Sequence, residues 1–362
     1  MSIEALARPE IVAMKPYSSA RKEAPGRGVL LNANEAPVSL LDSAPGLNRY
    51  PDPQPAALLE RLAHLYDVSP DRLLVTRGSD EGIDLLTRVF CRAGRDAILQ
   101  CPPAFGMYRI AAQTQGADVV SVPRRGGDFA LDETGVLDAL AADERIRLVF
   151  LTSPSNPTGD VLDPDFVGRV LQAAAGRALV VIDEAYAEFC ARPSHIRLID
   201  ENEHLVVLRT LSKAWAAAGL RCGSVIAQSA VIALLQRIIA PYPLPSPVVA
   251  LALEALQGDP ARRQRELLAQ VQADKARLIA LLEGRRFVQQ VLPGEANFVL
   301  VRVDDAPGLL AACAREGVIL RGFPADPALR DCLRISVGTG AELERLGAAL
   351  DHWDETLGDA PQ

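Results

Sequence analysis

The stretch Leu179-Val-Val-Ile-Asp-Glu-Ala-Tyr186 decides the fold, because a short apolar run leads here directly into two carboxylates and a phenol. An unbroken apolar run of this length predicts a strand that is buried on both faces. Similar runs lie on either side of it along the chain, and helical patterns such as 80–91 and 165–174 separate several of them. The further candidate strands are 73–76, 97–101, 119–122, 148–152, 206–208 and 225–227.

Strands spaced by helices are typical of an α/β fold, here a mainly parallel, mixed sheet of seven strands sandwiched by helices. The alternating prolines of Pro241-Tyr-Pro-Leu-Pro-Ser-Pro247 predict a stiff, non-helical connection after that sheet. An amphipathic stretch, alternating runs and a final helix then predict a smaller α+β domain, at 260–282, 297–303, 318–321, 333–337 and from residue 341. We therefore expect a large domain over 38–247, a small domain over 248–362, and an N-terminal arm, 1–37, that packs with the small domain.

Composition excludes several classes of protein. The net charge is −8, and no run of Lys or Arg indicates a nucleic-acid surface. The six cysteines form no C-x-x-C pair and the four histidines form no cluster, which indicates free thiols in a reducing compartment and no metal site. The first residues lack the apolar core of a signal peptide, and no apolar run approaches the ~20 residues of a membrane span. We expect a cytoplasmic protein.

The loops after two predicted strands carry polar residues that can bind an anion or a polar ligand. After 73–76 comes Arg77-Gly-Ser-Asp-Glu-Gly82, whose backbone N–H groups at a helix start would suit a phosphate. The alternative is a simple helix cap by Ser79 or Asp80. After 148–152 comes Ser153-Pro-Ser-Asn-Pro-Thr-Gly159, a rigid turn that explains its prolines and glycine but does not require Asn156.

The loops after the next two strands add a carboxylate, a phenol and a lysine. Asp183 and Tyr186 follow a buried strand and must face something polar, because burying them unpaired costs several kcal/mol. Lys213 lies between Ser212 and apolar residues, where burial would lower its pKa and favour a Schiff base with a carbonyl. Arg221 follows eight residues later and would bring a planar cation to a phosphate. In a parallel sheet all these loops meet at one edge.

The motifs Ser-Pro-x-Asn-Pro-Thr-Gly, Asp-Glu-Ala-Tyr and Ser-Lys-x-x-x-x-x-Gly-x-Arg occur here in the order and spacing of the fold-type-I pyridoxal-phosphate (PLP) aminotransferases, which the sequence resembles. It is most similar to the histidinol-phosphate aminotransferase family. The resemblance spans about residues 17 to 340 and is carried by the blocks 31–37, 49–55, 77–82, 101–108, 208–213, 239–244 and 332–339.

The resemblance implies a role for each matching residue. Lys213 would bind PLP covalently and shuttle the proton, Asp183 would pair with the pyridinium nitrogen, and Tyr186 would bond the 3′-oxygen together with Asn156. Phe105 replaces the tyrosine that the family often has; it keeps an aromatic face for stacking and loses a hydroxyl. The cofactor phosphate would be bound by Ser79, Asp80, Ser212, Arg221 and, from a neighbouring subunit, Tyr50.

The resemblance also implies the substrates. Arg334, aided by Tyr17, Arg321 and Asn156, would clamp the carboxylate of glutamate or the phosphate of histidinol phosphate. The implied reaction is transamination of L-histidinol phosphate with 2-oxoglutarate, which gives imidazole-acetol phosphate and L-glutamate in histidine biosynthesis. A homodimer with shared active sites would perform it. The alternatives are a threonine-phosphate decarboxylase-like lyase, a broad aromatic aminotransferase, and a non-catalytic PLP-fold regulator, against which the intact Lys213 argues.

Overall fold

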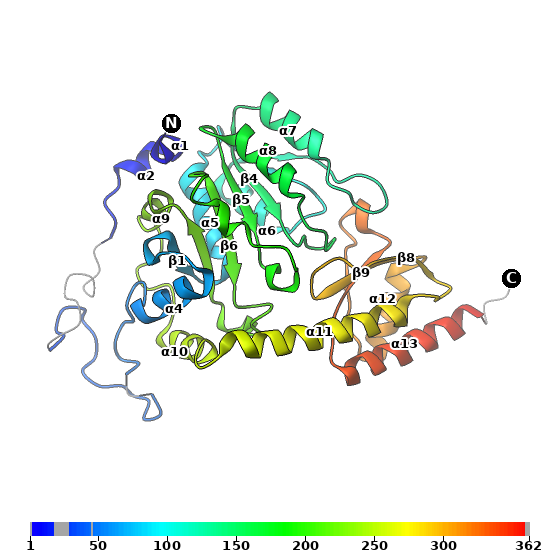
Figure 1. The fold of residues 1–362 in the computed structure, drawn as a ribbon. Coiled ribbons are helices and arrows are strands. Elements are labelled where there is room, and N and C mark those ends of the chain that lie inside the picture. The colour runs from blue at the N-terminus through cyan, green and yellow to red at the C-terminus, as the bar shows by residue number, and fades with distance from the viewer. Residues whose placement is uncertain (1, 18–28, 45, 359–362) are drawn as a thin grey trace.

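The computed structural model describes residues 2–17, 29–44 and 46–358, and within them the chain forms a seven-stranded and a four-stranded sheet (Figure 1). The larger sheet has the order β1-β7-β6-β5-β4-β2-β3. Only β7 runs antiparallel to its neighbours in this sheet, so the predicted mainly parallel, mixed α/β sheet is confirmed. Its strands are β1 (Leu73–Thr76), β2 (Ala97–Gln100), β3 (Asp118–Ser121), β4 (Ile146–Thr152), β5 (Leu179–Asp183), β6 (Leu205–Thr210) and β7 (Gly223–Ala227).

Helices cover both faces of this sheet because successive side chains of a strand point to opposite sides. In β5, Val180 and Ile182 pack into one core, while Leu179 and Val181 pack into the other. The first core is closed by α4 (Ala56–Tyr66), α7 (Glu133–Ala142), α8 (Pro164–Ala174) and α10 (Ser246–Ala255). The second is closed by α5 (Gly78–Phe90), α6 (Met107–Gln115) and α9 (Ser229–Leu235).

The described start of the chain belongs to the large domain. Two short helices, α1 (Ile3–Leu6) and α2 (Pro9–Ala13), bury Ile3, Leu6 and Ile11 in the second core. The Arg8 backbone N–H also donates to the Val89 carbonyl of α5 at 2.9 Å. The prediction of an irregular arm that packs with the small domain is therefore wrong for residues 3–13. Each helix is too short to show a helical repeat in the sequence.

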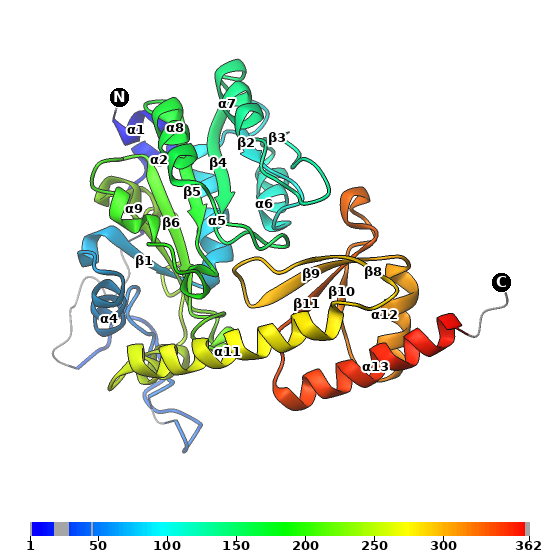
Figure 2. The ribbon, with the colours of Figure 1, turned by 45° about the vertical axis from the view of Figure 1, so that its right-hand side comes forward.

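The smaller domain is a four-stranded antiparallel sheet with helices on it (Figure 2). Its strand order is β10-β11-β9-β8, and the long helix α11 runs from beneath the large domain to this sheet. The predicted strand at 318–321 shrinks to β10, and Ile319 is 80% exposed. The elements are α11 (Pro260–Leu282), β8 (Val288–Leu292), β9 (Phe298–Val303), α12 (Ala306–Arg315), β10 (Arg321–Gly322), β11 (Cys332–Ser336) and α13 (Gly340–Gly358).

The connection between the domains differs from its prediction at one end. Residues 241–245 are non-helical, but α10 begins at Ser246 with Pro247 in its first turn, where a proline has no N–H to lose. Ala252 and Leu256 are buried in the first core of the large sheet. The expected division at 247/248 thus falls inside α10, and we propose that the large domain extends to Leu256. Short 3-10 helices complete the fold at Pro70–Arg72, Ala187–Phe189, His195–Leu198, Ala218–Leu220 and Pro327–Leu329.

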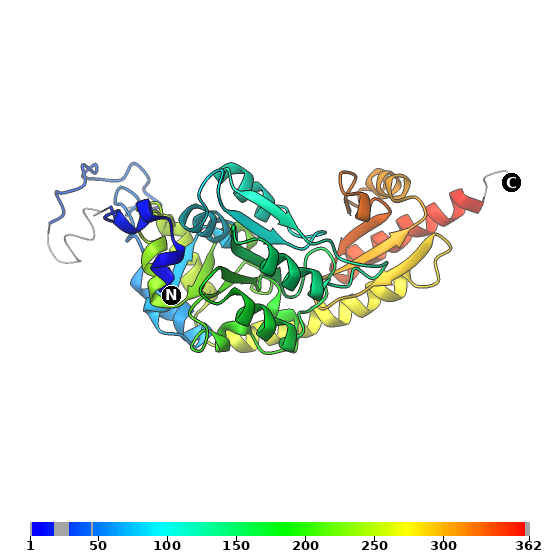
Figure 3. The same cartoon turned by 90° about the horizontal axis from the view of Figure 1, so that it is seen from above.

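Several contacts join the domains, which lie side by side when viewed from above (Figure 3), and two of them involve large-domain loops. Gly159 and Gly294 touch through their backbones, since a Cβ atom on Gly294 would lie 2.5 Å from the Gly159 Cα. Phe129 packs among small-domain residues that include Leu300, and the Arg302 guanidinium lies 5.4 Å from the centre of its ring. These contacts place the loop 153–159 of the large domain next to the small domain's sheet.

Candidate active site

The loops with the predicted site residues lie at one edge of the large sheet. Strands β4, β5 and β6 are parallel, so their carboxyl ends meet, and β1 points the same way because β7 is antiparallel to both β1 and β6. Asn156 follows β4, Asp183 ends β5, and Lys213 follows β6. Helix α5 begins directly after β1. The carboxyl edge of a parallel sheet is where such folds bind ligands.

Asp183 is a buried carboxylate, only 3% exposed. Its Oδ2 accepts from the Tyr108 hydroxyl at 2.8 Å and its Oδ1 accepts from the Ala185 N–H at 3.1 Å. Among the described residues no Lys, Arg or His forms an ion pair with it. Burial raises the pKa of Asp183 to about 6, against the hydrogen bonds that lower it. A buried carboxylate of this kind suits a cationic ligand group.

Lys213 is exposed to solvent, with its Nζ 5.5 Å from the centre of the Tyr186 ring. Desolvation by the surrounding protein, followed by the positive charge of Arg334, lowers the pKa of Lys213. Asp80 and Asp183 oppose this effect without cancelling it. A lowered pKa leaves more of the amine unprotonated and therefore nucleophilic towards a carbonyl group.

An anion site lies where α5 begins. The Arg221 guanidinium contacts the Asp80 carboxylate at 3.1 Å and the Ser212 hydroxyl at 3.4 Å. Arg77 is the N-cap residue of α5, so neither Ser79 nor Asp80 caps the helix and both lie in its first turn. A Cβ atom on Gly223 would lie 2.5 Å from the Ser79 nitrogen, and only glycine lets β7 approach the helix start this closely. Helix N–H groups and a guanidinium together suit a phosphate.

A second anion site involves the small domain. Arg334 of β11 donates through Nη1 to Asn156 Oδ1, and its guanidinium carbon lies 5.3 Å from the centre of the Phe298 ring. Arg321 pairs directly opposite Arg334 in the β10–β11 register, and both line one cavity of about 440 Å³. Like charges directly opposite each other are destabilising. No carboxylate in the described part of the chain forms an ion pair with either arginine, which leaves both for a ligand.

The remaining predicted residues lie around this centre. Phe105 is half-buried and meets the Tyr108 ring edge-on, with 5.8 Å between ring centres. Tyr50 is 50% exposed and stacks on Tyr242 with 4.5 Å between ring centres. Tyr17 is 67% exposed. Neither Tyr17 nor Tyr50 belongs to the side chains that the described contacts gather around Lys213.

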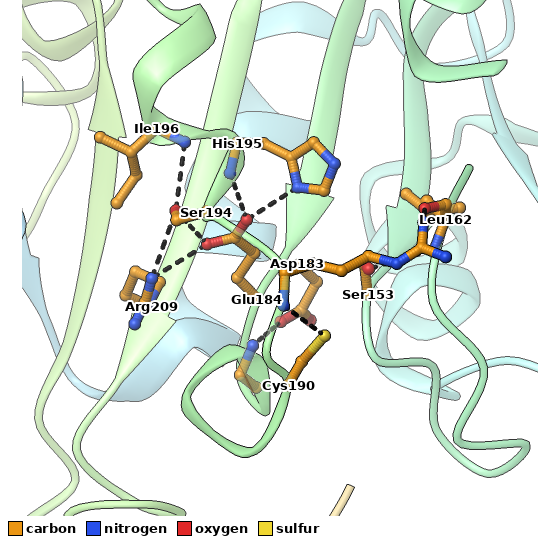
Figure 4. Close-up of polar contacts among 11 residues, drawn as sticks. Ser153, Leu162, Asp183, Glu184, Cys190, Ser194, His195, Ile196 and Arg209 are labelled. Carbon is orange, nitrogen blue, oxygen red and sulfur yellow. Dashed lines mark hydrogen bonds and ion pairs between the residues drawn. The ribbon is translucent and has the colours of Figure 1, made fainter. Parts of the chain in front are cut away.

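A buried polar network adjoins the site through Glu184, the residue after Asp183 (Figure 4). Glu184, next to Asp183, accepts from the Arg209 guanidinium at 2.9 Å and from the His195 backbone N–H at 2.7 Å. Arg209 also contacts Glu188 at 2.6 Å, and Glu188 accepts from the indole N–H of Trp215, two residues beyond Lys213, at 3.2 Å. The network thus ties the loop after β5 to the loop with Lys213.

Sequence reasoning missed Arg209, Glu184 and Tyr108, although Arg209 and Glu184 carried one signal. Charged residues inside or next to an apolar strand predict a buried ion pair, because an unpaired charge there is too costly. Tyr108 gave no such signal, since an aromatic residue on a helix is ordinarily part of the core. Within the described ranges, His, Cys, Asp and Glu side chains form no group of three that would bind a metal ion. None of the helices described is long and apolar enough to cross a membrane.

Comparison with known proteins agrees with this geometry. Residues 19–350 match the family model for aminotransferase class I and II. The chain is 44% identical over 352 residues to a histidinol-phosphate aminotransferase from Cronobacter sakazakii, covering 97% of each chain, and 43% identical to one from Escherichia coli, covering 97% of this chain and 98% of that protein. The chain therefore belongs to the class I and II aminotransferases and, within them, to the histidinol-phosphate aminotransferase family.

Solved structures show the same fold. A histidinol-phosphate aminotransferase from Sinorhizobium meliloti, in complex with pyridoxal-5′-phosphate, matches with a TM-score of 0.78 at 25% identity, over 86% of this chain and 84% of that one. An L-threonine-O-3-phosphate decarboxylase from Porphyromonas gingivalis matches with a TM-score of 0.72 at 22% identity, over 85% and 91%. The second likeness concerns the fold alone, so the fold does not separate an aminotransferase from a decarboxylase.

Proposed function

We propose that this protein is a PLP-dependent aminotransferase that transfers the amino group of L-histidinol phosphate to 2-oxoglutarate, in histidine biosynthesis. The observation that carries the proposal is a pair of separate arginine sites whose charges both act on Lys213. Arg221 lies at the start of α5, and Arg334 lies opposite Arg321 on the small domain. One site suits the cofactor phosphate and the other the substrate anion. The 44% identical relative supports the same substrate assignment.

The residues present fit PLP. The start of α5, Ser212 and Arg221 form a cradle for its phosphate, and Gly223 lets β7 lie directly against that helix start, because a Cβ atom there would collide with the Gly78 and Ser79 backbone. Asp183 is a buried carboxylate with no cationic partner of its own among the described side chains, as a pyridinium nitrogen requires. Lys213 supplies an amine whose pKa is lowered. These residues would hold the phosphate, the ring nitrogen and the aldehyde carbon of one molecule.

The chain's own groups then divide the reaction between them. When bound, PLP acts as an electron sink that acidifies the substrate's α-C–H bond. Asp183 would hold the proton on the ring nitrogen, and the Lys213 amine would serve as the base that carries the substrate's α-proton to the cofactor. Burial raises the pKa of the Tyr186 phenol to about 12, so it stays protonated and can donate a hydrogen bond to the 3′-oxygen, as Asn156 can through its amide.

The substrate anion is bound by Arg334, with Arg321 beside it. A guanidinium offers two parallel N–H donors that match either a carboxylate or a phosphate. One site can therefore accept histidinol phosphate in the first half-reaction and 2-oxoglutarate in the second. Asn156 accepts a hydrogen bond from Arg334, so the substrate clamp and the loop after β4 are mechanically linked. Tyr17 would close over this site from the N-terminal segment.

We further propose a cytoplasmic homodimer whose two active sites are shared. The segment around residues 29–41 exposes large apolar side chains, among them Val29 at 86%, Leu31 at 88% and Leu40 at 98%. Such side chains gathered in one segment favour a protein partner, here a second copy related by a two-fold axis. Tyr50 follows this segment and would reach the partner's cofactor phosphate. The six cysteines are free and five of them are buried, which supports a reducing compartment.

One assay tests the activity. Purified protein with PLP, histidinol phosphate and 2-oxoglutarate is expected to form imidazole-acetol phosphate and glutamate in equal amounts. The same preparation is tested with phosphothreonine for release of carbon dioxide, and with phenylalanine or tyrosine as amino donors. Carbon dioxide release without keto-acid formation would identify a lyase instead. Equal kcat/KM for aromatic amino acids and histidinol phosphate would identify a broad aminotransferase.

A further inference from the structure

Tyr108 contacts Asp183 and has no role of its own in the proposed reaction. It lies on α6 with no exposed surface, and its ring stacks on Phe150 of β4 at 4.7 Å between ring centres and an interplanar angle of 9°. Its hydroxyl oxygen is 2.8 Å from Asp183 Oδ2 and 2.8 Å from Thr152 Oγ1. Because the ring is packed on a strand of the sheet, the position of the hydroxyl is set by the core.

The three polar groups form a chain with one direction. A tyrosine hydroxyl has a single proton to donate. When Asp183 is ionised, that proton must lie towards the carboxylate, so Thr152 must donate its own proton to the Tyr108 oxygen. The order of donation is then Thr152 to Tyr108 to Asp183. Hydroxyl groups in such a chain polarise one another and strengthen the last hydrogen bond.

A purely structural role accounts for only part of this arrangement. A buried tyrosine hydroxyl needs a partner, but Thr152 alone would satisfy it. Asp183 already accepts from the Ala185 N–H. That bond reaches only Oδ1, so among the described contacts the Tyr108 hydroxyl is the donor that serves the other carboxylate oxygen, Oδ2. What it does is to stabilise the charged form of a carboxylate that burial disfavours.

We propose that Tyr108, with Thr152 behind it, is a positioning residue that keeps Asp183 ionised and oriented for the ring nitrogen of the cofactor. The inference rests on the proposed function, because Asp183 faces that nitrogen only if PLP binds here. Tyr108 itself touches Asp183 and acts through it. Burial and the charge of Asp183 raise the pKa of Tyr108 well above its ordinary value, so it stays a proton donor throughout the working pH range.

The charged groups around Asp183 show why such a donor is needed. Burial raises the pKa of Asp183 most, and the nearby charges of Asp80 and Glu184 raise it further. The hydrogen bonds from Tyr108 and the Ala185 N–H lower it, and the outcome is a pKa of about 6. The Lys213 amine and the Tyr186 phenol also face this carboxylate. Without the Tyr108 proton, the pKa of Asp183 rises towards neutrality and a neutral acid becomes common at pH 7.

The test compares wild type with Tyr108→Phe, Thr152→Val and the double variant, all as the full-length chain. The Asp183 ¹³Cγ resonance, assigned by its absence in Asp183→Asn, is titrated before PLP is added. In Tyr108→Phe we expect the pKa of Asp183 to rise by about one pH unit, from the loss of a hydrogen bond to a charged group. Thr152→Val should give a smaller rise of the same sign. The double variant should match Tyr108→Phe, since Thr152 acts through Tyr108.

A second readout uses the protein with PLP bound. In Tyr108→Phe the ¹⁵N resonance of labelled cofactor should show a smaller fraction of protonated ring nitrogen. The PLP dissociation constant at pH 5, below both pKa values, should rise about tenfold, because the ionised fraction of Asp183 falls about tenfold there when its pKa rises by one unit. Tyr66→Phe is the matched control, because it removes another buried tyrosine hydroxyl from the opposite face of the same sheet. It should leave both readouts at wild-type values.

The outcomes separate this inference from the proposal beneath it. An unchanged Asp183 titration in Tyr108→Phe, with only a lower melting temperature, would mean that Tyr108 is a core residue and nothing more. If Tyr108→Phe does not fold, Thr152→Val alone decides, and a rise in the pKa of Asp183 supports the relay while none overturns it. A wild-type chain that fails to bind PLP would instead overturn the proposed cofactor site itself.

Discussion

At the scale of single residues, Asp183 shows how the fold gives up stability for the site. Burying a carboxylate without a cationic partner raises its pKa from the ordinary 3.8 to about 6. The native chain without cofactor therefore binds this proton more tightly than the unfolded chain does. The stabilising contribution is complete below about pH 4 and is lost as the pH rises through 6. A bound cationic ring would supply the missing partner at neutral pH.

Asp183→Asn is expected to separate stability from function. The amide has no charge to bury, so the variant does not lose stability when the pH rises through 6. In the absence of cofactor, the unfolding free energy of wild type should therefore fall by about 3 kcal/mol relative to that of the variant between pH 4 and pH 8. With PLP, the variant should still bind but lose most of its turnover. Urea unfolding at several pH values measures the first effect and single-turnover transamination the second. A pH-independent difference, or near wild-type turnover, would contradict the assignment.

Arg334 is the residue whose geometry decides substrate binding. We expect Arg334→Lys to raise KM about tenfold or more for both histidinol phosphate and 2-oxoglutarate. The reason is that a single ammonium group replaces a bidentate guanidinium, whose hydrogen bond to a charged group is worth roughly 1.5–3 kcal/mol. Steady-state kinetics with each substrate measures this. Arg321→Lys is the comparison and should have a smaller effect, because Arg321 is the more exposed of the two arginines. If KM is unchanged in Arg334→Lys but rises strongly in Arg321→Lys, then Arg321 is the main residue that binds the substrate anion and Arg334 is the auxiliary one.

At the scale of elements, the junction between β7 and α5 sets the cofactor cradle. Gly223 pairs with Thr76 in the β1–β7 register and with Thr210 in the β6–β7 register, so it sits between two strand ends. A Cβ atom there would lie 2.4 Å from the Gly78 carbonyl carbon. Because that atom belongs to the backbone, the helix start would have to move as a whole.

Gly223→Ala is therefore expected to weaken PLP binding at least tenfold and to destabilise the chain by about 1–3 kcal/mol, the usual range for overpacking. Gly219→Ala is the matched control, since a Cβ atom there has no neighbour within 4 Å. PLP titration by absorbance and thermal unfolding measure the two effects. Equal PLP affinity in both variants would show that the close approach of β7 and α5 does not shape the phosphate site.

Much of the element order was predictable from sequence, and the exceptions have physical reasons. The unbroken apolar sequence of β5 predicts a strand that is buried on both faces. Because the loops after parallel strands share one edge of the sheet, Asp183 and Lys213 could also be placed together from the sequence. In the run at 318–321, the apolar residues 318–320 are half-buried or exposed, and apolarity alone does not reveal that. Tyr108 was missed because a core aromatic and an aromatic that touches a catalytic carboxylate have the same sequence pattern.

At the scale of the whole molecule, the site depends on how the two domains meet. Asn156 lies in the loop that contacts the small domain through Gly159 and Gly294, and Arg334 belongs to that domain. Within the small domain, Lys275 of α11 holds the Gly294 segment in place, because its Nζ donates to the Gly294 and Ala296 carbonyls at 2.8 and 2.6 Å. A small movement between the domains would therefore change the distance between the substrate clamp and the cofactor cradle.

The proposed dimer leads to the last prediction, which concerns active sites shared between chains. Tyr50 stacks on Tyr242 and stays half exposed after a segment of exposed apolar side chains, as a residue that reaches a partner would. Lys213→Ala and Tyr50→Asp are each expected to be inactive. When equal amounts are unfolded together and refolded, half of the dimers should be mixed. Each mixed dimer has one site with both defects and one with neither, so activity should return to about a quarter of wild type.

A mixture of Lys213→Ala and Asp183→Asn is the matched control, because both residues lie at the same sheet edge of one chain. Each chain in a mixed dimer then carries its own defect, no site is intact, and activity should stay at the level of the parents. If Tyr50 served the site of its own chain, the Tyr50→Asp mixture would behave like this control. Equal, negligible activity in both mixtures, with dimers present by light scattering, would therefore overturn the shared site while leaving the dimer itself in place.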